Sequence, residues 1–253
     1  NLKNFSWMSV VAAMGQMFYS LSIAMGILIT FGSYMKKDTS IEDSTRNVEI
    51  FDTAIAIMAG LMIIPAVFVF SGTDGMGVGP SLMFVSLPKV FDAMGPAGTV
   101  VGVLFFISAI FATLTSCISV LESIVANCME IFHTDRKKTT LVLALIYLAA
   151  SAVIALGYSV FYFNVTLPNG SSAQLLDIMD YVSNSVMMPL IALLSTILIG
   201  WVKSPKYVAD EMERGGYKFR RKRMYYVMIR YVAPVMMLVL FLQSTGLLSM
   251  IFK

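Results

Sequence analysis

Long apolar segments dominate this sequence. A helix that crosses the hydrocarbon core of a bilayer needs roughly 20 predominantly apolar residues. Six segments meet this requirement, at about 7–35, 52–71, 97–131, 138–162, 174–202 and 226–252. Only 13% of the 253 residues are charged, whereas a soluble domain carries about 25% charged residues. The sequence therefore predicts an all-α polytopic membrane protein with six transmembrane helices, in which residues 1–253 form a single transmembrane domain.

A further apolar stretch lies between the second and third of these spans. It reads GPSLMFVSLPKVFD at 79–92, and it is short and contains two prolines. A stretch of this length is too short to span a bilayer as a helix. We therefore expect a re-entrant or interfacial helical hairpin here.

The basic residues give the chain an orientation. Fifteen of the 18 lysines and arginines lie in or beside the loops that follow the first, third and fifth spans, and the other side has only Lys3, Lys89 and Lys253. The positive-inside rule places the basic side in the cytoplasm, which predicts a multi-pass protein of the plasma (inner) membrane. The run KFRRKR at 218–223 is typical of an anchor to lipid headgroups. Membrane lipid is thus an expected partner, and the net charge of +3 does not indicate nucleic acid.

The sequence offers no support for catalysis. It contains no nucleophile motif, phosphate-binding loop or dinucleotide fingerprint. His133 is the only histidine, and it has no second imidazole or thiolate at the spacing of a transition-metal site. We expect no catalytic residues and no bound metal other than an alkali cation.

The first span has an unusual middle. Ser20 and Ser22 flank Leu21, and the small residues Ala24 and Gly26 follow. One reading is a helix broken at mid-membrane, because transporters use unwound carbonyls and half-helix ends to hold ions and charged substrate groups. The other reading is a continuous helix, with the serines bonded back to carbonyls one turn earlier and the glycine serving close packing. The residues alone leave both readings open.

The third span has a face of oxygen-bearing groups. Residues 112–116 read ATLTS, so that Ala112, Thr115 and Ser116 share one face of a helix. Two hydroxyls and a carbonyl are hard oxygen ligands that suit a hard monovalent cation. The alternative is a contact between helices through small polar residues.

Several acids lie at or near membrane depth, where charge is costly and marks function or a partner. Asp52 stands at the start of the second span, where interfacial solvation beside a helix N-terminus is the plain alternative. Glu122 lies within the third span and fits equally a structural role, paired with a basic group or backbone, or a functional one. Asp177 and Asp180 open the fifth span in LLDIMDYV (175–182), where carboxylates complement the helix dipole.

The stretch GQMFYSLSIAMGILITFGSY at 15–34 resembles helix six of the neurotransmitter:sodium symporter family, which includes bacterial amino-acid transporters. The likeness continues along the chain as helices six to eleven, in order. It implies part of an inverted-repeat transporter fold, with a discontinuous first helix. The partners it implies are an amino-acid substrate, a hydrophobic one, and the missing N-terminal helices of the same transporter.

The resemblance assigns a substrate site to Tyr19, Ser20, Ser22, Met25, Ser116 and Val120. Tyr19 corresponds to the aromatic lid over the substrate, and Ser22 to a backbone contact with it. Met25 stands where many members have a phenylalanine, which alters the shape of the pocket.

The resemblance also implies two sodium sites and a gate. Ser20 and Asp52 belong to the first sodium site, where Asp52 replaces an asparagine and supplies negative charge that chloride provides in animal members. Ala112, Thr115 and Ser116 correspond to ligands of the second sodium site. LDIMD resembles the helix-ten motif whose second acid, here Asp180, belongs to the extracellular gate. The stretch at 79–92 resembles the extracellular loop that acts as a lid.

The function implied is symport of an amino acid with sodium ions by alternating access, carried out as part of a complete transporter. The alternative is a non-transporting membrane fragment or assembly partner that keeps the fold and lacks a complete site. A channel is disfavoured, because the sequence has neither rings of charge nor a repeated filter motif.

Overall fold

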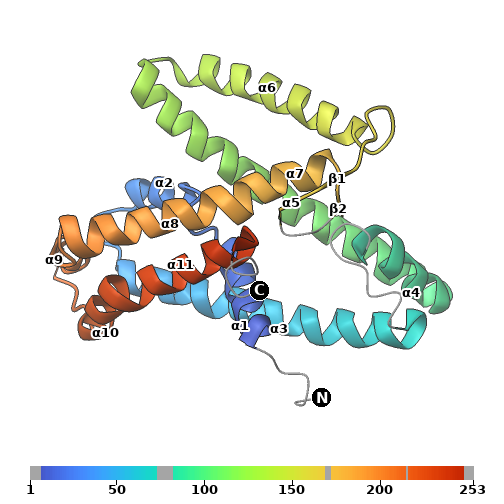
Figure 1. Cartoon of the computed structure of the whole chain (residues 1–253), viewed down its shortest axis with the longest axis horizontal. Coiled ribbons are helices and arrows are strands. Elements are labelled where there is room, and N and C mark those ends of the chain that lie inside the picture. Colours follow the sequence, from blue (N-terminus) through green and yellow to red (C-terminus); the bar gives the residue numbers. More distant parts are fainter. Residues whose placement is uncertain (1–6, 73–81, 169–171, 215, 248–253) are drawn as a thin grey trace. The chain divides into compact units, whose positions relative to one another are not determined.

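The structure is a computed structural model that describes residues 7–72, 82–168, 172–214 and 216–247 (Figure 1). The first third of the chain forms the helices α1 (Trp7–Ser20), α2 (Ile27–Tyr34), α3 (Ile41–Ser71), the π-helical turn η2 (Leu82–Ser86) and α4 (Leu87–Ala93). The middle forms α5 (Pro96–Phe132), α6 (Arg136–Leu156) and the two-residue strands β1 (Val165–Thr166) and β2 (Ser172–Ala173). The strands pair antiparallel, with Val165 opposite Ala173.

The last third contains two long helical runs that include π-helical turns. The first run comprises α7 (Leu175–Asp180), η3 (Tyr181–Met187), α8 (Met188–Ile197) and η4 (Leu198–Val202). The short helix α9 (Lys206–Met212) follows, and the second run comprises α10 (Lys222–Val227), η5 (Met228–Val232) and α11 (Ala233–Ser244). Inserted π-turns of this kind leave carbonyls for other partners.

Five helical runs within the described residues are long and apolar enough to cross a membrane. They cover Ile41–Val69, Pro96–Phe132, Arg136–Leu156, Leu175–Val202 and Lys222–Ser244, with mean hydropathies between 1.8 and 2.3. The first predicted span appears as two shorter helices, α1 and α2. The predicted all-α membrane fold with a discontinuous first helix is confirmed.

Three predicted boundaries were wrong. The second span begins at Ile41 rather than about residue 52, because Ser40 Oγ accepts a hydrogen bond from the Asp43 amide at 3.2 Å and starts the helix early. The fourth ends at Leu156 rather than about 162, where tight hydrogen-bonded turns begin. The sixth begins at Lys222 rather than about 226, and its helix ends at Ser244. Apolarity marks the part of a helix in lipid, not the part that is helical.

The hairpin expected at 79–92 falls partly outside the described residues, which begin again at Leu82. From there η2 and α4 form one helical segment up to Ala93. Its re-entrant or interfacial placement stays a prediction, as does the single transmembrane domain, since contacts divide the chain into two compact units. Unit 1 contains residues 1–44 and 120–253, and unit 2 contains residues 45–119.

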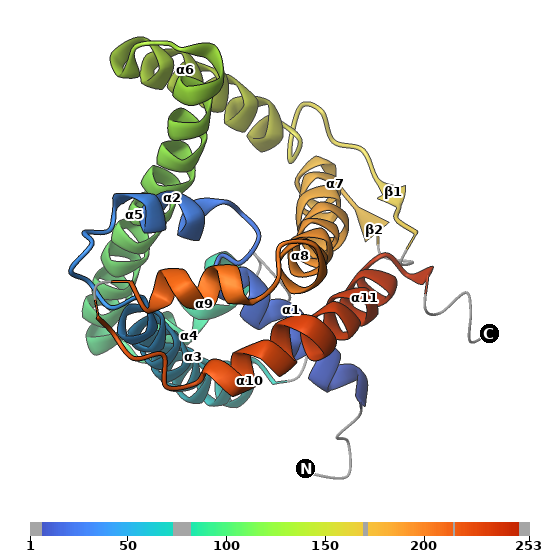
Figure 2. The same cartoon turned by 90° about the vertical axis from the view of Figure 1, so that its left-hand side faces the viewer.

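The core of unit 1 lies between α8 and α11, which run side by side in both views (Figures 1 and 2). Ala192 of α8 is buried there against Met237 and Leu240 of α11. The α1 residues Met14 and Phe18 pack against the same cluster. This packing holds the helix that precedes the break in a fixed position.

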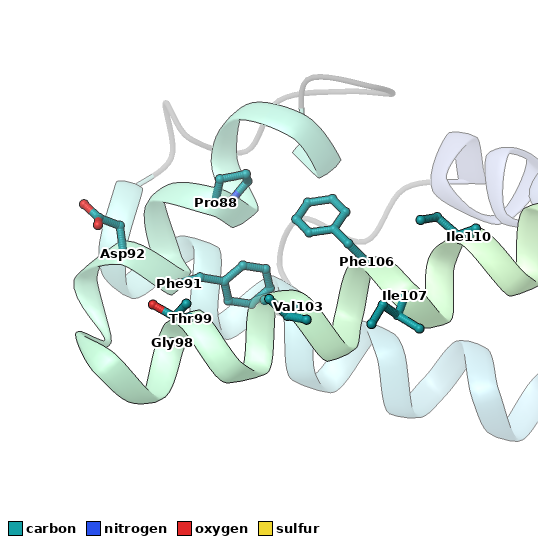
Figure 3. A pocket seen from close by; sticks show the side chains of 10 residues that line it. Pro88, Phe91, Asp92, Gly98, Thr99, Val103, Phe106, Ile107 and Ile110 are labelled. Carbon is teal, nitrogen blue, oxygen red and sulfur yellow. The ribbon is translucent and has the colours of Figure 1, made fainter.

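The core of unit 2 joins α3, α4 and the first part of α5. Val67 is buried against Leu87 and Val90. At the corner between α4 and α5, a Cβ on Gly98 would come within 1.7 Å of the Phe91 carbonyl oxygen, so only glycine fits. Beside this corner the rings of Phe91 and Phe106, 6.4 Å apart, line an apolar pocket of about 460 Å³ (Figure 3).

Candidate functional site

The chain is unwound between α1 and α2, where the sequence predicted a break. α1 ends at Ser20 and α2 begins at Ile27. Between them Ser22, Ala24 and Gly26 have positive φ angles of 53°, 65° and 79°. A left-handed conformation costs roughly 1–2 kcal/mol for a residue that has a side chain. Two such non-glycine residues in one short segment are typical of a functional site, where surrounding structure holds strain in place.

The break exposes backbone acceptors. The last hydrogen bonds of the α1 side run from the amides of Ser22 and Ile23 to the carbonyls of Tyr19 and Phe18, and the ladder resumes at the bond from Thr30 to Gly26. In the part of the chain that the structure describes, no backbone amide donates to the carbonyls of residues 21–25. Unpaired carbonyls at membrane depth are tolerated beside protein or a hydrated cavity. They are suitable acceptors for a hard cation or an ammonium group.

The second half-helix is docked on α5 through Ser123. Thr30 Oγ1 donates a hydrogen bond of 3.2 Å to Ser123 Oγ, and both side chains are buried. A Cβ on Gly26 would lie only 3.1 Å from the same oxygen. Gly26 thus meets two requirements, a positive φ and a close approach to α5. This contact fixes where α2 begins.

Further along α2, Tyr34 contacts a charged pair. Its hydroxyl donates to Glu122 Oε1 at 2.7 Å, and Arg136 Nη2 donates to Glu122 Oε2 at 2.6 Å. The possibility that Glu122 pairs with a basic group is therefore confirmed. Gly26, Thr30 and Tyr34 are spaced by four residues, so one face of α2 contacts α5 along its length.

Sequence reasoning missed Thr30, Tyr34, Ser123 and Arg136 as parts of this arrangement. The four-residue spacing of Gly26, Thr30 and Tyr34 was visible in the sequence. It did not identify the partners, because the contacts join segments about 90 residues apart.

The oxygen face of α5 converges on one carbonyl. Thr115 Oγ1 donates to the Ala112 carbonyl oxygen at 2.8 Å, and Ser116 Oγ donates to the same atom at 3.1 Å. These bonds bring the three predicted ligand oxygens together on an exposed side of unit 2. The hydroxyl lone pairs remain available to a cation. The same bonds also occur in helices where such hydroxyls are only structural, so the sodium role is taken up below as a proposal.

Asp52 lies about three turns inside α3 and is half-buried. The alternative reading, that it is solvated beside a helix N-terminus, is wrong, because α3 begins at Ile41. Glu42 and Asp43 occupy the first turn instead. An acid held this far along an apolar helix is a candidate for function.

The acids before α8 have distinct environments. Asp177 closes a capping box with Gln174, whose backbone amide donates to Asp177 Oδ2 at 2.9 Å. Asp177 therefore caps α7, as the dipole reading expected. Asp180 is exposed, and it accepts a hydrogen bond from the Asn184 amide. An exposed carboxylate on this helix is sterically free for a role in a gate.

The predicted site residues are divided between the two units. Tyr19, Ser20, Ser22 and Met25 lie at the break in unit 1, where Tyr19 is 50% exposed, and Val120 lies on α5 in the same unit and is 37% exposed. Unit 2 contains Asp52 and the Ala112, Thr115 and Ser116 group. The structure thus brings together the residues at the break and, separately, the oxygens of the α5 face.

Comparisons with known proteins agree on one family. The model of the sodium:neurotransmitter symporter family matches residues 2–250. YhdH, described as an uncharacterized sodium-dependent transporter of Bacillus subtilis (strain 168), is 31% identical over 244 residues, which are 95% of this chain and 52% of the relative. The human sodium- and chloride-dependent GABA transporter 2 is 25% identical over 208 residues, 78% of this chain and 33% of that protein.

A solved structure gives the same result. The crystal structure of MhsT in complex with L-phenylalanine matches with a TM-score of 0.82 and 33% sequence identity, covering 95% of this chain and 54% of that one. The chain spans about half the length of the bacterial relatives it matches.

Proposed function

The chain belongs to the sodium:neurotransmitter symporter family, and we propose that it supplies one half of a transporter that couples inward sodium flow to amino-acid uptake. The family consists of secondary transporters rather than enzymes, and the chain is a multi-pass protein of the plasma membrane. Because the relatives are about twice as long, the activity proposed is that of the complete protein.

The unwound segment between α1 and α2 carries the proposal. Its carbonyls at residues 21–25 accept no described backbone amide, so they are free for sodium or for the ammonium group of an amino acid. The start of α2 adds the positive partial charge of a helix N-terminus, which favours a carboxylate. A zwitterionic amino acid fits both features. Ser22 takes part through its backbone and Tyr19 through its ring.

Two groups of oxygen ligands support sodium coupling. Ala112, Thr115 and Ser116 offer a neutral three-oxygen site, from which a monovalent ion is released readily because no carboxylate holds it. Ser20 and Asp52 belong to the other site, where the Asp52 carboxylate supplies charge. Sodium is the ion the family name and the relatives indicate.

The substrate proposed is a hydrophobic amino acid. MhsT was solved with L-phenylalanine, and the side chains assigned to the pocket include apolar Met25 and Val120. Apolar side chains in the pocket stabilise an apolar substrate through burial of its surface.

Coupling follows from the cost of ordering the break. Sodium that binds the carbonyls and hydroxyls stabilises the unwound conformation, so less ordering remains for the substrate to drive. The occupied site then favours closure on the outer side, where Asp180 contributes to the gate. Alternating access results when the occupied site favours one state over the other.

Variants of Ser22 test this proposal. Ser22 needs a positive φ of 53°, which glycine adopts freely and a β-branched residue resists. In proteoliposomes with an inward sodium gradient, Ser22→Gly should keep amino-acid uptake within about twofold, whereas Ser22→Val should lower it tenfold or more. Loss of uptake in both variants would contradict a backbone role. Uptake that persists without sodium would contradict the coupling.

A further inference from the structure

A second cavity lies in unit 1, apart from the break. It occupies about 620 Å³ between the 35–40 connection after α2 and the end of α9. Its polar lining includes Lys36, Lys37 and Thr39, and its apolar lining includes Met35 and Met212. A volume of this size suits a small organic ligand.

The cavity has uncompensated positive charge. Arg214, which also lines it, is paired with Glu211, with Nη1 at 2.9 Å from Oε2. Neither Lys36 nor Lys37 has an ion-pair partner among the described residues. The lining therefore presents two free ammonium groups beside a hydroxyl. Ammonium groups and hydroxyls are the usual side-chain ligands of phosphate oxygens.

The walls of the cavity are held together by the chain itself. The Tyr217 hydroxyl donates to the Asp38 carbonyl oxygen. The Arg220 amide donates to Glu42 Oε2 at 2.9 Å, so this nearby carboxylate is engaged outside the cavity. Both bonds join the 35–44 segment to the loop between α9 and α10, which pre-forms the cavity. A pre-formed site spends less of its binding energy on ordering.

We propose that this cavity binds a phosphate ester, in the form of the headgroup of an anionic phospholipid. Its polar and apolar walls lie at the ends of α2 and of the α7–η4 run, the boundary at which a headgroup meets acyl chains. Lys36 and Lys37 take the phosphate, and the methionines contact the glycerol and the first methylenes. The positive-inside rule puts the site in the cytoplasmic leaflet.

The test measures binding to the purified complete transporter in a neutral detergent. The probes are dioctanoyl phosphatidylglycerol, dioctanoyl phosphatidylcholine and glycerol 3-phosphate, titrated calorimetrically without sodium. K36Q/K37Q is compared with K206Q/K218Q, which removes two basic residues of the same face that do not line the cavity. About fivefold is expected for each lysine lost, so K36Q/K37Q should weaken phosphatidylglycerol binding about 25-fold and K206Q/K218Q less than twofold.

The probes separate the two sources of phosphate. Tighter binding of phosphatidylglycerol than of glycerol 3-phosphate assigns the lipid, whereas equal binding assigns a soluble phosphate ester to the same site. Thr39→Val, which keeps all charges, should weaken binding about threefold to fivefold and decides the matter if K36Q/K37Q does not fold.

Three results would overturn the site: no binding of either anionic probe, an equal loss in K206Q/K218Q, or unchanged binding in both K36Q/K37Q and Thr39→Val. Because the titration contains no sodium and no amino acid, none of these results bears on the transport function proposed above.

Discussion

Glu122 and Arg136 form an ion pair in which Nη2 of the arginine lies 2.6 Å from Oε2 of the glutamate, while the other glutamate oxygen accepts the Tyr34 hydroxyl at 2.7 Å. One carboxylate thus joins three helices, α2, α5 and α6. The glutamate side chain is 19% exposed and that of the arginine 59%, so the glutamate is the partially desolvated member. A change at Glu122 should therefore affect the docking of α2 more than a change at Arg136.

A double-mutant cycle tests this junction. Glu122→Gln removes the ion pair, and Tyr34→Phe removes one hydrogen bond, each costing about 1 kcal/mol. Because both variants act on the same carboxylate, the double variant should lose about 0.5 kcal/mol or more less than the sum. Chemical unfolding of the complete transporter measures it. Arg214→Gln, whose pair with Glu211 is exposed, is the control and should change stability by less than 0.5 kcal/mol. Strict additivity would contradict the shared junction.

Gly26→Ala should destabilise the protein and impair uptake. The left-handed φ of 79° costs alanine about 1–2 kcal/mol, and the new methyl group would lie 3.1 Å from Ser123 Oγ. Gly32→Ala is the matched control on the same helix, because a Cβ there meets nothing within 4 Å; it should be neutral or slightly stabilising. Thermal melting in detergent compares the two. Equal melting temperatures would show that Gly26 has no special role.

Combining Gly26→Ala with Ser123→Ala separates its two causes. The second change removes the crowding and leaves the backbone strain, so melting temperature should recover only in part. Full recovery would assign the whole effect to crowding, and no recovery would assign it to the backbone.

Thr115→Val and Ser116→Ala should raise the sodium concentration that half-saturates uptake. Each change replaces a proposed ligand hydroxyl with an apolar group of similar size. Losing a buried polar partner costs about 1–3 kcal/mol, roughly 5- to 150-fold in affinity. Thr113→Val is the control, since Thr113 Oγ1 makes the same kind of bond, to the Ala109 carbonyl at 2.8 Å, on another face of α5. If all three variants shift sodium dependence alike, the α5 hydroxyls are structural.

Asp52 should make uptake independent of chloride. A carboxylate beside bound sodium supplies charge that asparagine does not, so Asp52→Asn should lower uptake, with recovery when chloride replaces gluconate. Glu49→Gln, one turn earlier on α3 and exposed, is the control and should leave uptake unchanged. Chloride-dependent uptake by the unaltered protein would contradict this role.

The break between α1 and α2 was predictable from local sequence. Serines, small residues and Gly26 gather where an apolar helix would otherwise continue, and the family resemblance favoured the broken reading. The capping box of Asp177 was predictable for the same reason, because it lies within four residues of chain.

The contacts of α2 were not predictable in the same way. Glu122 announced a partner by its depth in an apolar helix, but sequence did not choose among the nearby basic residues. The early start of α3 was missed because charged residues before Asp52 lower hydropathy without weakening a helix. Ser40, its N-terminal cap, was the signal that hydropathy overlooked.

Equilibrium binding of a panel of radiolabelled amino acids to the purified complete transporter tests the central claim most directly. Binding is measured in sodium and in potassium at equal ionic strength, with Thr115→Val beside the unaltered protein. The account predicts that at least one hydrophobic amino acid binds in sodium and is lost in potassium, and that Thr115→Val needs more sodium for half-saturation. Binding that is equal in sodium and potassium, or the absence of binding by every amino acid of the panel, would contradict it.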